Sequence, residues 1–598
     1  MNQYQLRIQE LQREMEVCGL HYYLVQTADP HQSEYIDKHY KAREYLTGFT
    51  GSNGTLLVTR TEAIMWTDGR YDVQAKLELE GSQIILYITN QEKTVTLPDY
   101  LKKSLHEGEI IGFDGRIVSA YFGNMLQKLA KKLQGEVNGT FDLVSLIWKN
   151  RPNIEFQELF CLPKEHIEDT CKEKCALIRK NMQEKACSYF VLSKLDDIMW
   201  LLNIRGRDVP HNLVGYAHIV MNQETIILYS RRSKHTEKFQ VYCDEQEIIC
   251  REYEEFEEAI ACLEIKEGLV WIDPKSTTFT ILHYLNSKNQ LYQKTNPTLL
   301  PKSLKSNTEI KYLKETYEKD SVVMTKFLYW MKHILPMKEV TEYTAGMYLD
   351  NLRREVEGFI DYSFDTICAY GEQAAMMHYM ADATSCKVVK QEGMLLVDSG
   401  AHYYGGTTDV TRTIVLGELT KEQKKHYTLV VAGMLRLQNA VFIKGCTGRN
   451  LDILARNLLW KELLDYKCGT GHGVGYMLNV HEGPQGIRYQ YNQGEEETVF
   501  LPGMVTSNEP GVYLEGAYGI RIENIMVCKE CAEQRNDTFL CFEPLTLVPI
   551  DLDGIDVTYM AEEDRKNINE YHKMVYKKIS IHLEDKELEW LKEVTREI

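Results

Sequence analysis

The alternation of apolar and polar positions predicts two successive rounds of helices and strands, followed by a third region of a different kind. In the first round, Leu6, Leu11 and Met15 fit one face of an N-terminal helix. Short apolar runs predict strands at residues 22–25, 55–58, 63–67 and 84–88. An Arg-Pro-Asn sequence within residues 150–153 interrupts the pattern, so we place the end of the first domain there.

The second round repeats this alternation over a similar length. A helix is predicted over residues 170–185, and strands are predicted at residues 189–192, 226–229 and 269–272. A segment with two prolines, residues 297–301, ends the round. We therefore expect two α/β domains, residues 1–153 and 154–304.

The third region begins with Ser306 and Glu309 at the spacing of a capping box. One face of the long helix that follows contains Ile310, Leu313, Tyr317, Met324, Leu328 and Met331. A second helix is predicted from about Thr341, after which the sequence becomes rich in strands and glycine. From about Glu562 the chain is again helical and charged. We expect a third domain over residues 305–598, with a C-terminal helical extension, and we expect the chemistry to lie there.

Composition restricts the class of protein. A chain of 598 residues is too long to fold around a single hydrophobic core. Its 44% of hydrophobic residues is too high for a disordered protein. Its formal charge of −18 argues against a nucleic-acid or anionic-membrane partner. No apolar run approaches the roughly 18 residues that span a bilayer, and the start lacks the apolar core of a signal peptide. Since the 15 cysteines fit reduced thiols, we expect a soluble, cytoplasmic protein.

Two aspartates occupy apolar strand sequences in the third region. Asp398 ends GMLLVDSGA, and Asp409 lies in TTDVTRTIV after a glycine-containing turn, so a hairpin would bring the two to one end of a sheet. A buried carboxylate costs several kcal/mol unless it is paired. Taken alone, the pair favours a solvated hairpin tip or an ion pair with Arg412 over a functional site.

Three more residues extend this set. Glu509 precedes Pro-Gly in VTSNEPGVY, Glu523 lies in the apolar sequence GIRIENIMV, and His472 lies in GTGHGVG. The alternating glycines around His472 suit a close backbone approach to a ligand on an extended segment. The spacing is not that of a dinucleotide-binding loop, and HEGPQ at residues 481–485 lacks the second histidine of H-E-x-x-H. A lone histidine among glycines is more often structural than a ligand.

The five residues together predict a dinuclear metal site. Four carboxylates carry about −4 of charge, which two divalent cations would cancel. Oxygen-rich ligation with one imidazole favours Mn²⁺, Co²⁺ or Fe²⁺ over a thiolate-bound structural zinc. Such a site activates water and polarises a carbonyl or phosphoryl oxygen. From its residues alone, the chain is expected to be a metallohydrolase.

The motifs DSG, TTDVTRT, GTGHGVG, NEPG and RIEN, in this order, resemble those of the pita-bread metallopeptidases. NVHEGPQGIRY, EPLTLVPIDLDGID, YLTGFTGSNGTLLV and WTDGRY resemble the three-domain cytosolic type of Xaa-Pro aminopeptidase (aminopeptidase P) in that family. The resemblance covers essentially the whole chain. It implies an α/β (α+β) fold in which two creatinase-like N-terminal α/β domains, both non-catalytic, precede a C-terminal pita-bread metallopeptidase domain.

The resemblance also implies a role for each member of the set. Asp409 and Glu523 would bridge two divalent metal ions, most commonly Mn²⁺, with Co²⁺, Fe²⁺ or Zn²⁺ as alternatives. Asp398 would complete the coordination of one ion. His472 and Glu509 would complete that of the other.

Three further residues match positions that act on the substrate in this family. His378, in MMHYM, would contact the substrate and the tetrahedral intermediate, and His481, in NVHEGP, would bind the peptide near the scissile bond. Arg521 would lie beside the metal ligands. From the residues alone, a packed core histidine is the preferred interpretation of His378, and an ordinary ion pair is the alternative for Arg521.

The implied reaction is release of the N-terminal residue from peptides with proline in the second position, by attack of a hydroxide that bridges the two metals. Glu509 would accept the proton of the hydroxide and pass it to the proline nitrogen. The alternatives are a prolidase, which cuts Xaa-Pro dipeptides, and a non-catalytic peptide-binding scaffold. The resemblance also implies a homodimer.

The cysteines include one departure from the family pattern. Cys468 stands four positions before His472, where aminopeptidase P commonly has a histidine. Because a thiol is a weak hydrogen-bond donor, this puts in doubt a proton-relay or substrate-steering role at that position. Cys528 and Cys531 form a C-x-x-C pair, which we interpret as two reduced thiols rather than a zinc or redox site.

Overall fold

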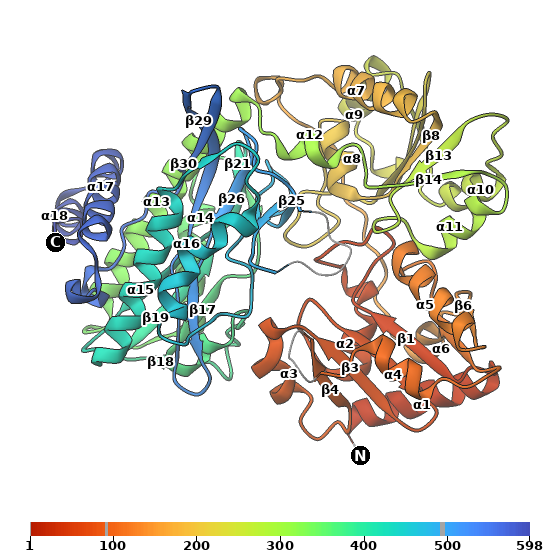
Figure 1. Ribbon diagram of the computed structural model, residues 1–598, viewed down its shortest axis with the longest axis horizontal. Coiled ribbons are helices and arrows are strands. Elements are labelled where there is room, and N and C mark those ends of the chain that lie inside the picture. Colours follow the sequence, from red (N-terminus) through yellow and green to blue (C-terminus); the bar gives the residue numbers. More distant parts are fainter. Residues whose placement is uncertain (1, 90–93, 491–496) are drawn as a thin grey trace. The chain divides into compact units, whose positions relative to one another are not determined.

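In the described part of residues 1–299, the strands form two six-stranded mixed sheets, each with helices packed on it (Figure 1). The computed structural model describes residues 2–89, 94–490 and 497–598. The first sheet contains β1 (Tyr22–Gln26), β2 (Thr55–Thr59), β3 (Ala63–Thr67), β4 (Ile85–Ile88), β5 (Ile110–Phe113) and β6 (Glu136–Asn138). The second contains β8 (Cys187–Leu192), β10 (Ala217–Asn222), β11 (Ile226–Ser230), β12 (Ile248–Arg251), β13 (Leu269–Ile272) and β14 (Leu291–Gln293).

The two sheets have the same topology. Their orders are β4-β3-β2-β1-β5-β6 and β12-β11-β10-β8-β13-β14, and corresponding neighbours run in the same relative direction. The helices of this half are α1 (Gln3–Val17), α2 (Ala42–Thr47), α3 (Asp72–Glu78), α4 (Leu97–Ser104), α5 (Ala120–Lys132), α6 (Leu143–Ile147), α7 (Cys171–Glu184), α8 (Leu195–Leu201), α9 (Glu237–Glu245), α10 (Glu255–Cys262) and α11 (Phe279–Asn286). A short pair, β7 (Phe160–Cys161) and β9 (Ile204–Arg205), completes it.

The predicted strands and helices of this half are confirmed, with one correction. Leu11 and Met15 are buried on α1 as expected, but Leu6 is 50% exposed and Ile8 is buried instead. Ile8, Leu11 and Met15 follow the three- and four-residue spacing of one helix face, whereas Leu6 falls outside it. The predicted helix at residues 170–185 begins at a capping box between Thr170 and Glu173.

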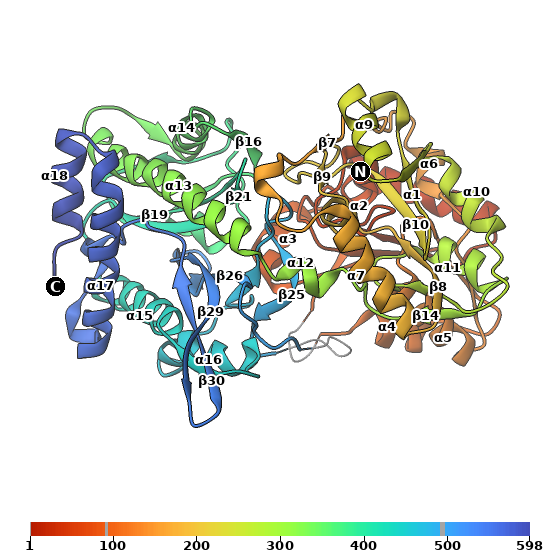
Figure 2. The same cartoon turned by 90° about the horizontal axis from the view of Figure 1, so that it is seen from above.

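The second half of the chain, residues 300–598, surrounds its strands with long helices (Figure 2). The helices are α12 (Leu299–Ser303), α13 (Asn307–Ile334), α14 (Glu342–Arg354), α15 (Lys421–Gln438), α16 (Gly448–Trp460), α17 (Glu562–Ile579) and α18 (Asp585–Val594). The strands are β15 (Val340–Thr341), β16 (Phe359–Tyr362), β17 (Ile367–Tyr370), β18 (Val388–Val389), β19 (Met394–Ser399), β20 (Ala401–Tyr403), β21 (Gly406–Thr407), β22 (Val410–Val415), β23 (Val441–Ile443), β24 (Gly471–Gly473), β25 (Glu482–Ile487), β26 (Val505–Asn508), β27 (Gly511–Leu514), β28 (Tyr518–Arg521), β29 (Asn524–Gln534) and β30 (Asp537–Pro544).

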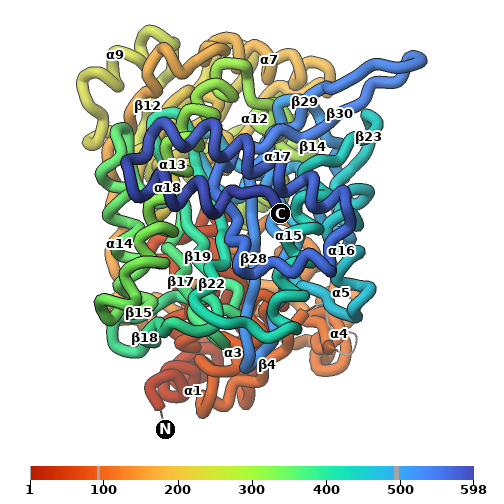
Figure 3. Tube along the Cα trace, turned by 90° about the vertical axis from the view of Figure 1, so that its left-hand side faces the viewer, coloured from red at the N-terminus to blue at the C-terminus, as the bar shows by residue number. Residues whose placement is uncertain are grey.

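Two antiparallel sheets carry most of the predicted site residues in this half. One has the order β17-β19-β22 and the other has the order β23-β30-β29-β26-β24-β25. β29 and β30 form a hairpin whose tip extends beyond the other strands (Figures 2 and 3). The helices α17 and α18 lie side by side against α13, which confirms the expected helical C-terminal region (Figure 3).

The predicted start of α13 is confirmed. Ser306 and Glu309 form the capping box, and Leu313, Tyr317, Met324, Leu328 and Met331 are buried on the helix. Ile310, which we expected on this face, is half-buried. α14 begins at Glu342 with Thr341 as its N-cap, which agrees with the predicted start at about Thr341.

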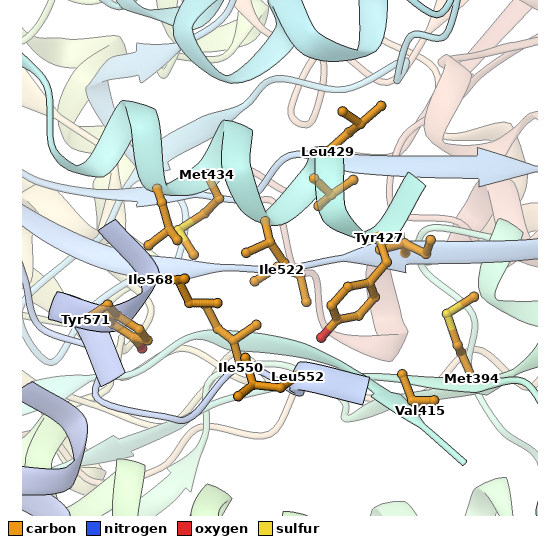
Figure 4. Packing of buried hydrophobic residues seen from close by; sticks show 14 of the residues in the cluster. Met394, Val415, Tyr427, Leu429, Met434, Ile522, Ile550, Leu552, Ile568 and Tyr571 are labelled. Carbon is orange, nitrogen blue, oxygen red and sulfur yellow. The ribbon is translucent and has the colours of Figure 1, made fainter. Parts of the chain in front are cut away.

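A large hydrophobic core joins helices α15 and α17 to the strands (Figure 4). Tyr427 and Met434 of α15 pack in it together with Ile568 of α17 and Ile522. Ile522 lies between β28 and β29 and is fully buried. Since burying such a side chain contributes about 2 kcal/mol, the core anchors the backbone that presents Glu523.

Candidate metal centre

The five predicted metal ligands lie on or directly beside strands of the two antiparallel sheets. Asp398 lies within β19 and His472 lies within β24, whereas Glu509 directly follows β26. Asp409 and Glu523 were expected inside strands, and this prediction was wrong in detail. Asp409 directly precedes β22, and Glu523 lies in the break between β28 and β29.

The strands that carry Asp398 and Asp409 pair, but they do not form a simple hairpin. β19 is antiparallel to β22, with Asp398 opposite Thr411 and Ser399 opposite Val410. The connection contains β20 and β21, and β20 pairs with both β16 and β21 in a separate small sheet. The loop is therefore a folded element rather than the simple turn we expected.

The structure brings Asp409, His472 and Glu523 together. One ligand atom from each lies within 4.8 Å of those of the other two. His472 Nε2 also lies 3.2 Å from Glu509 Oε1 and 3.6 Å from Asp409 Oδ2. Four of the five predicted ligands thus surround one point, although they lie far apart in the sequence.

The imidazole of His472 is oriented to offer Nε2 to this point. Its Nδ1 lies 3.0 Å from the carbonyl oxygen of Gly473, so Nδ1–H donates to that carbonyl. Nε2 then faces Asp409 and Glu509 and is the ring atom that a metal ion would bind. This is the arrangement by which proteins fix the tautomer of a metal-binding histidine.

Asp398 is held by an arginine on the neighbouring strand. Arg521 Nη2 donates to Asp398 Oδ2 at 2.6 Å, and both side chains are largely buried. Arg412, the partner we considered from the sequence, instead donates to Asn524 Oδ1 and to the carbonyl oxygens of Glu523 and Val548. Because Asp398 and Asp409 are both buried, a solvated hairpin tip is also excluded.

The carboxylates crowd one another inside the protein. Burial, and then the charges of Glu523, Asp398 and Glu509, raise the pKa of Asp409 well above its ordinary value. Burial, and then the charges of Glu509 and Asp398, raise the pKa of Glu523 to about 8. Burial lowers the pKa of His472, but its hydrogen bond with Glu509 and the charge of that carboxylate raise it to about 9 overall. Such a concentration of negative charge favours bound cations.

Two oxygens of the cluster fit metal coordination. Asp398 Oδ1 and Glu523 Oε1 are buried, and neither has a hydrogen-bond partner among the described residues. Leaving such oxygens unsatisfied costs free energy unless a cation binds them. Carboxylate oxygens with one imidazole are also a donor set that divalent metals accept. The residues present therefore fit a divalent metal centre.

Thr411 links several of these groups and was missed by the sequence reasoning. Its hydroxyl donates to Glu523 Oε2 at 2.9 Å and accepts from Arg521 Nε at 3.2 Å. Tyr513 also contacts Arg521, with its hydroxyl 2.8 Å from Nη1. The signal was present, since Thr411 lies on the same side of TTDVTRT as Asp409, but its partners are distant in sequence.

The two predicted substrate histidines lie in different elements. The ring of His481 meets that of His472 edge-on, with centroids 4.3 Å apart. His378 lies in a turn after the 3₁₀ helix Gly371–Ala375, and it is half-buried. The carbonyl oxygen of Met377, its neighbour, accepts a bond of 3.4 Å from Arg521 Nη2. Arg521 therefore contacts both Asp398 and the backbone beside His378.

The glycines on either side of His472 allow neighbouring backbone to pack closely. A Cβ at Gly471 would lie 2.0 Å from the carbonyl oxygen of Ser507, and one at Gly473 would lie 2.2 Å from that of Glu482. The close approach that we predicted is therefore to neighbouring strands of the protein. The approach of a ligand to this segment stays a prediction.

The segment before His472 is held from α16. Arg456 is buried and donates to the carbonyl oxygens of Tyr466 and Cys468, both at 2.9 Å, and to Asp452 Oδ2 at 2.7 Å. Cys468 itself is half-buried. Its backbone position is thus fixed independently of its side chain.

All 15 cysteines lie in the described residues, and all of them are free thiols there. Cys528 is buried in β29 and Cys531 is exposed on the same strand. Within the described part of the chain, none of the helices combines the length and apolar character needed to cross a bilayer.

Four sequence profiles of known families match the chain. The Creatinase/Prolidase N-terminal domain matches residues 7–145 and, in a second form, residues 150–309. Metallopeptidase family M24 matches residues 311–530, and the C-terminal region of peptidase M24 matches residues 538–598.

Relatives of known name match over almost the whole length. A probable Xaa-Pro aminopeptidase P from Paracoccidioides brasiliensis is 35% identical over 614 residues, which cover 99% of this chain and 98% of the relative. Xaa-Pro aminopeptidase 1 from Dictyostelium discoideum is 35% identical over 608 residues, which cover 98% and 95%.

Solved structures give the same result. The crystal structure of an X-prolyl aminopeptidase from Caenorhabditis elegans, described as a cytosolic enzyme with a dinuclear active site, matches with a TM-score of 0.94 and 32% identity. The match covers 100% of this chain and 99% of that protein. An Xaa-Pro dipeptidase from Bacillus anthracis matches over only 64% of this chain, at 22% identity and a TM-score of 0.51, which is a similarity of fold.

Proposed function

We infer that this chain, which belongs to the M24 metallopeptidase family and to the Xaa-Pro aminopeptidases within it, is a hydrolase that releases the N-terminal residue from peptides with proline in the second position. The expected fold class is confirmed: two creatinase-like N-terminal α/β domains precede a C-terminal metallopeptidase domain. The observation that carries the function is the similarity over the whole chain combined with the buried carboxylate cluster.

The length of the match favours an aminopeptidase over a prolidase. The Xaa-Pro aminopeptidases from Paracoccidioides brasiliensis, Dictyostelium discoideum and Caenorhabditis elegans each match 98% or more of this chain, whereas the dipeptidase structure matches 64%. Peptides of this kind need a dedicated enzyme because the Xaa-Pro bond is a tertiary amide without an N–H group. Peptidases that bind that donor handle such bonds poorly.

The cluster would hold two divalent metal ions. Asp409 and Glu523 would bridge the two ions, Asp398 would complete one, and His472 with Glu509 would complete the other. We propose Mn²⁺ as the metal, because oxygen ligands predominate and only one imidazole is present. Bound ions of this kind supply a nucleophile from water at neutral pH and polarise the scissile carbonyl.

The protein's own groups bind the peptide and stabilise the developing charge. His481, beside His472, would bind the peptide near the scissile bond. His378 would donate to the carbonyl oxygen as it becomes negative, which is the role of an oxyanion-stabilising donor. Arg521 would fix the position of His378 relative to Asp398, since it donates both to Asp398 and to the carbonyl oxygen of Met377.

Glu509 is the residue that we propose for proton transfer. Ser507 Oγ donates to Glu509 Oε1 at 3.0 Å, and Glu509 N donates to the carbonyl of Thr470 at 2.8 Å, so the carboxylate has a fixed orientation. It would accept the proton of the nucleophile and deliver it to the leaving proline nitrogen.

The remaining proposals concern organisation and location. We propose that residues 1–153 and 154–304 are non-catalytic domains that restrict substrates to short peptides or loose termini. Residues 305–598 would form the catalytic domain. We further propose that the protein acts in the cytoplasm as a homodimer. Support comes from the relatives, one of which is described as cytosolic.

One experiment tests the activity. Metal-stripped and Mn²⁺-restored protein would each be given Arg-Pro-Pro and Gly-Pro, and the released amino acids would be measured by mass spectrometry. We expect release of arginine from the tripeptide only after Mn²⁺ is restored. Cleavage of the dipeptide alone would identify a prolidase, and protein that purifies and reconstitutes without stoichiometric metal would be a scaffold.

A further inference from the structure

A single buried carboxylate holds the segment that carries His378. Glu342, the first residue of α14, is a carboxyl side chain with no exposed surface. Its Oε1 accepts from the backbone N–H of Tyr370 at 2.6 Å, and its Oε2 accepts from the backbone N–H of Lys387 at 2.8 Å. Those two N–H groups stand at the two ends of residues 370–387. The carboxylate therefore links the two ends of this segment.

The same carboxylate also reaches the middle of the segment. The hydroxyl of Tyr379, the residue after His378, donates to Glu342 Oε2 at 2.9 Å. The side-chain amide of Gln373 also faces this carboxylate, and with the amide turned so that its nitrogen points to Glu342 it donates to both oxygens. Hydrogen bonds to a charged acceptor contribute more than neutral ones, and several converging on one buried group fix its neighbours strongly.

His378 is thus held from both sides. On one side, Arg521 binds the carbonyl oxygen of Met377, and on the other, Glu342 binds the hydroxyl of Tyr379. Arg521 is bonded to Asp398, so one of these contacts originates at the metal centre. The contact with Tyr379 comes from the first residue of α14. The strand directly before α14, β15, pairs with β18.

We propose that Glu342 is a positioning residue for the peptidase reaction, which places the imidazole of His378 against the scissile carbonyl by holding residues 370–387. The inference rests on the proposed function, and it assigns a role to a residue outside the metal centre. The hydrogen bonds that Glu342 accepts come from Tyr370, Tyr379 and Lys387, none of which is a predicted metal ligand. Removing the carboxylate should therefore affect turnover without affecting metal binding.

The test compares Glu342→Gln with wild type in kcat, KM and bound metal. Glutamine keeps the size of the side chain but offers one acceptor oxygen, whereas the carboxylate accepts from Tyr370, Tyr379 and Lys387 and also faces the amide of Gln373. A misplacement of about 1 Å costs about 100-fold in rate, so we expect kcat to fall by about that factor, with metal content unchanged and KM within about threefold. Glu339→Gln, the same change at an exposed position three residues earlier, should leave all three quantities unchanged.

The double variant Glu342→Gln/His378→Ala tells a positioning role from general damage. If Glu342 acts through His378, the double variant should be no slower than His378→Ala alone, because residues that act as a unit are non-additive. Two effects that multiply would overturn the inference. Should Glu342→Gln fail to fold, Tyr379→Phe decides the matter, since it removes one bond and should lower kcat about fivefold. An unchanged kcat in Tyr379→Phe would also overturn it.

These outcomes are distinct from failure of the proposed function. If wild-type protein binds no metal or cleaves no Xaa-Pro peptide, the function itself is wrong. If wild type is active and the effects of Glu342 and His378 multiply, only this inference is wrong.

Discussion

Arg521 donates to Asp398 through Nη2 at 2.6 Å and thereby occupies one oxygen of a buried carboxylate. The other oxygen, Oδ1, has no hydrogen-bond partner among the described residues. An arginine that donates to one oxygen of a carboxylate fixes the orientation of the group and leaves the second oxygen able to bind a cation. The same guanidinium bonds to Tyr513 and Thr411, so its position is itself fixed.

This relationship predicts the effect of Arg521→Lys. A lysine keeps the positive charge but cannot reach Asp398, Thr411 and the carbonyl of Met377 at once. We expect metal affinity or kcat/KM to fall by about 10- to 100-fold, which is the usual cost of losing a group that orients a ligand. Metal titration and steady-state kinetics would measure it, and a variant with both values intact would contradict the assignment.

Asp409→Asn should abolish turnover. The change removes one bridging charge while preserving the shape of the side chain, so the fold should be retained. Losing about 4 kcal/mol of transition-state stabilisation lowers the rate about 1000-fold. Elemental analysis should show at most one ion per chain. Full activity with two bound ions would show that Asp409 is not a ligand.

Cys468→His should leave activity intact or raise it. The backbone of Cys468 is fixed by Arg456, which bonds to its carbonyl oxygen, so a larger side chain can enter without moving His472. Histidine is also the residue commonly found at this position in the family. A collapse of kcat in this variant, measured on an Xaa-Pro tripeptide, would mean that the thiol has a function of its own.

Glu482 should be a stability determinant. It directly follows His481 and forms ion pairs with Lys305 and, at 3.6 Å, with Lys302, and all three side chains are buried. Glu482→Gln leaves two buried lysines without a counter-charge, so we expect a loss of about 3–5 kcal/mol in the free energy of unfolding. Urea unfolding would measure it. As a matched control, Glu497→Gln breaks the partly exposed pair with Arg449 and should cost about 0.5 kcal/mol or less.

His572 should make the catalytic half sensitive to acid. It is fully buried on α17 and accepts from the backbone N–H of Ile550 at 3.1 Å. Burial, and then the charges of Arg412 and Arg596, lower its pKa to about 3. The unfolded chain binds this proton near pH 6.5, so the stability contributed by the neutral ring is complete above that pH and is lost as pH falls towards 3.

The loss by pH 5 is about 2 kcal/mol. We therefore expect the thermal unfolding midpoint to drop between pH 7 and pH 5, and we expect His572→Gln to drop less, because glutamine can accept the same bond without titrating. Equal drops in the two proteins would assign the acid sensitivity to other groups.

Much of the fold was predictable because local patterns carried it. The capping box of Ser306 and Glu309 and the apolar spacing on α13 gave the correct start and buried face of that helix. Leu6 was misplaced because a short amphipathic helix permits more than one choice of face, and only packing selects Ile8. The strand breaks at Asp409 and Glu523 were missed because β-branched residues continue on both sides of each acid, and periodicity does not show where a strand ends.

The sequence by itself determined the chemistry available: four acids and one histidine within motifs that resemble one family, in a chain of matching length. Only the tertiary structure decided which oxygens are left unpaired, that Asp398 pairs with Arg521 rather than Arg412, and that Glu342 holds the residues around His378. The physical reason is that such bonds join residues far apart in the chain. Their formation depends on sheet register and burial, which no local pattern of side chains specifies.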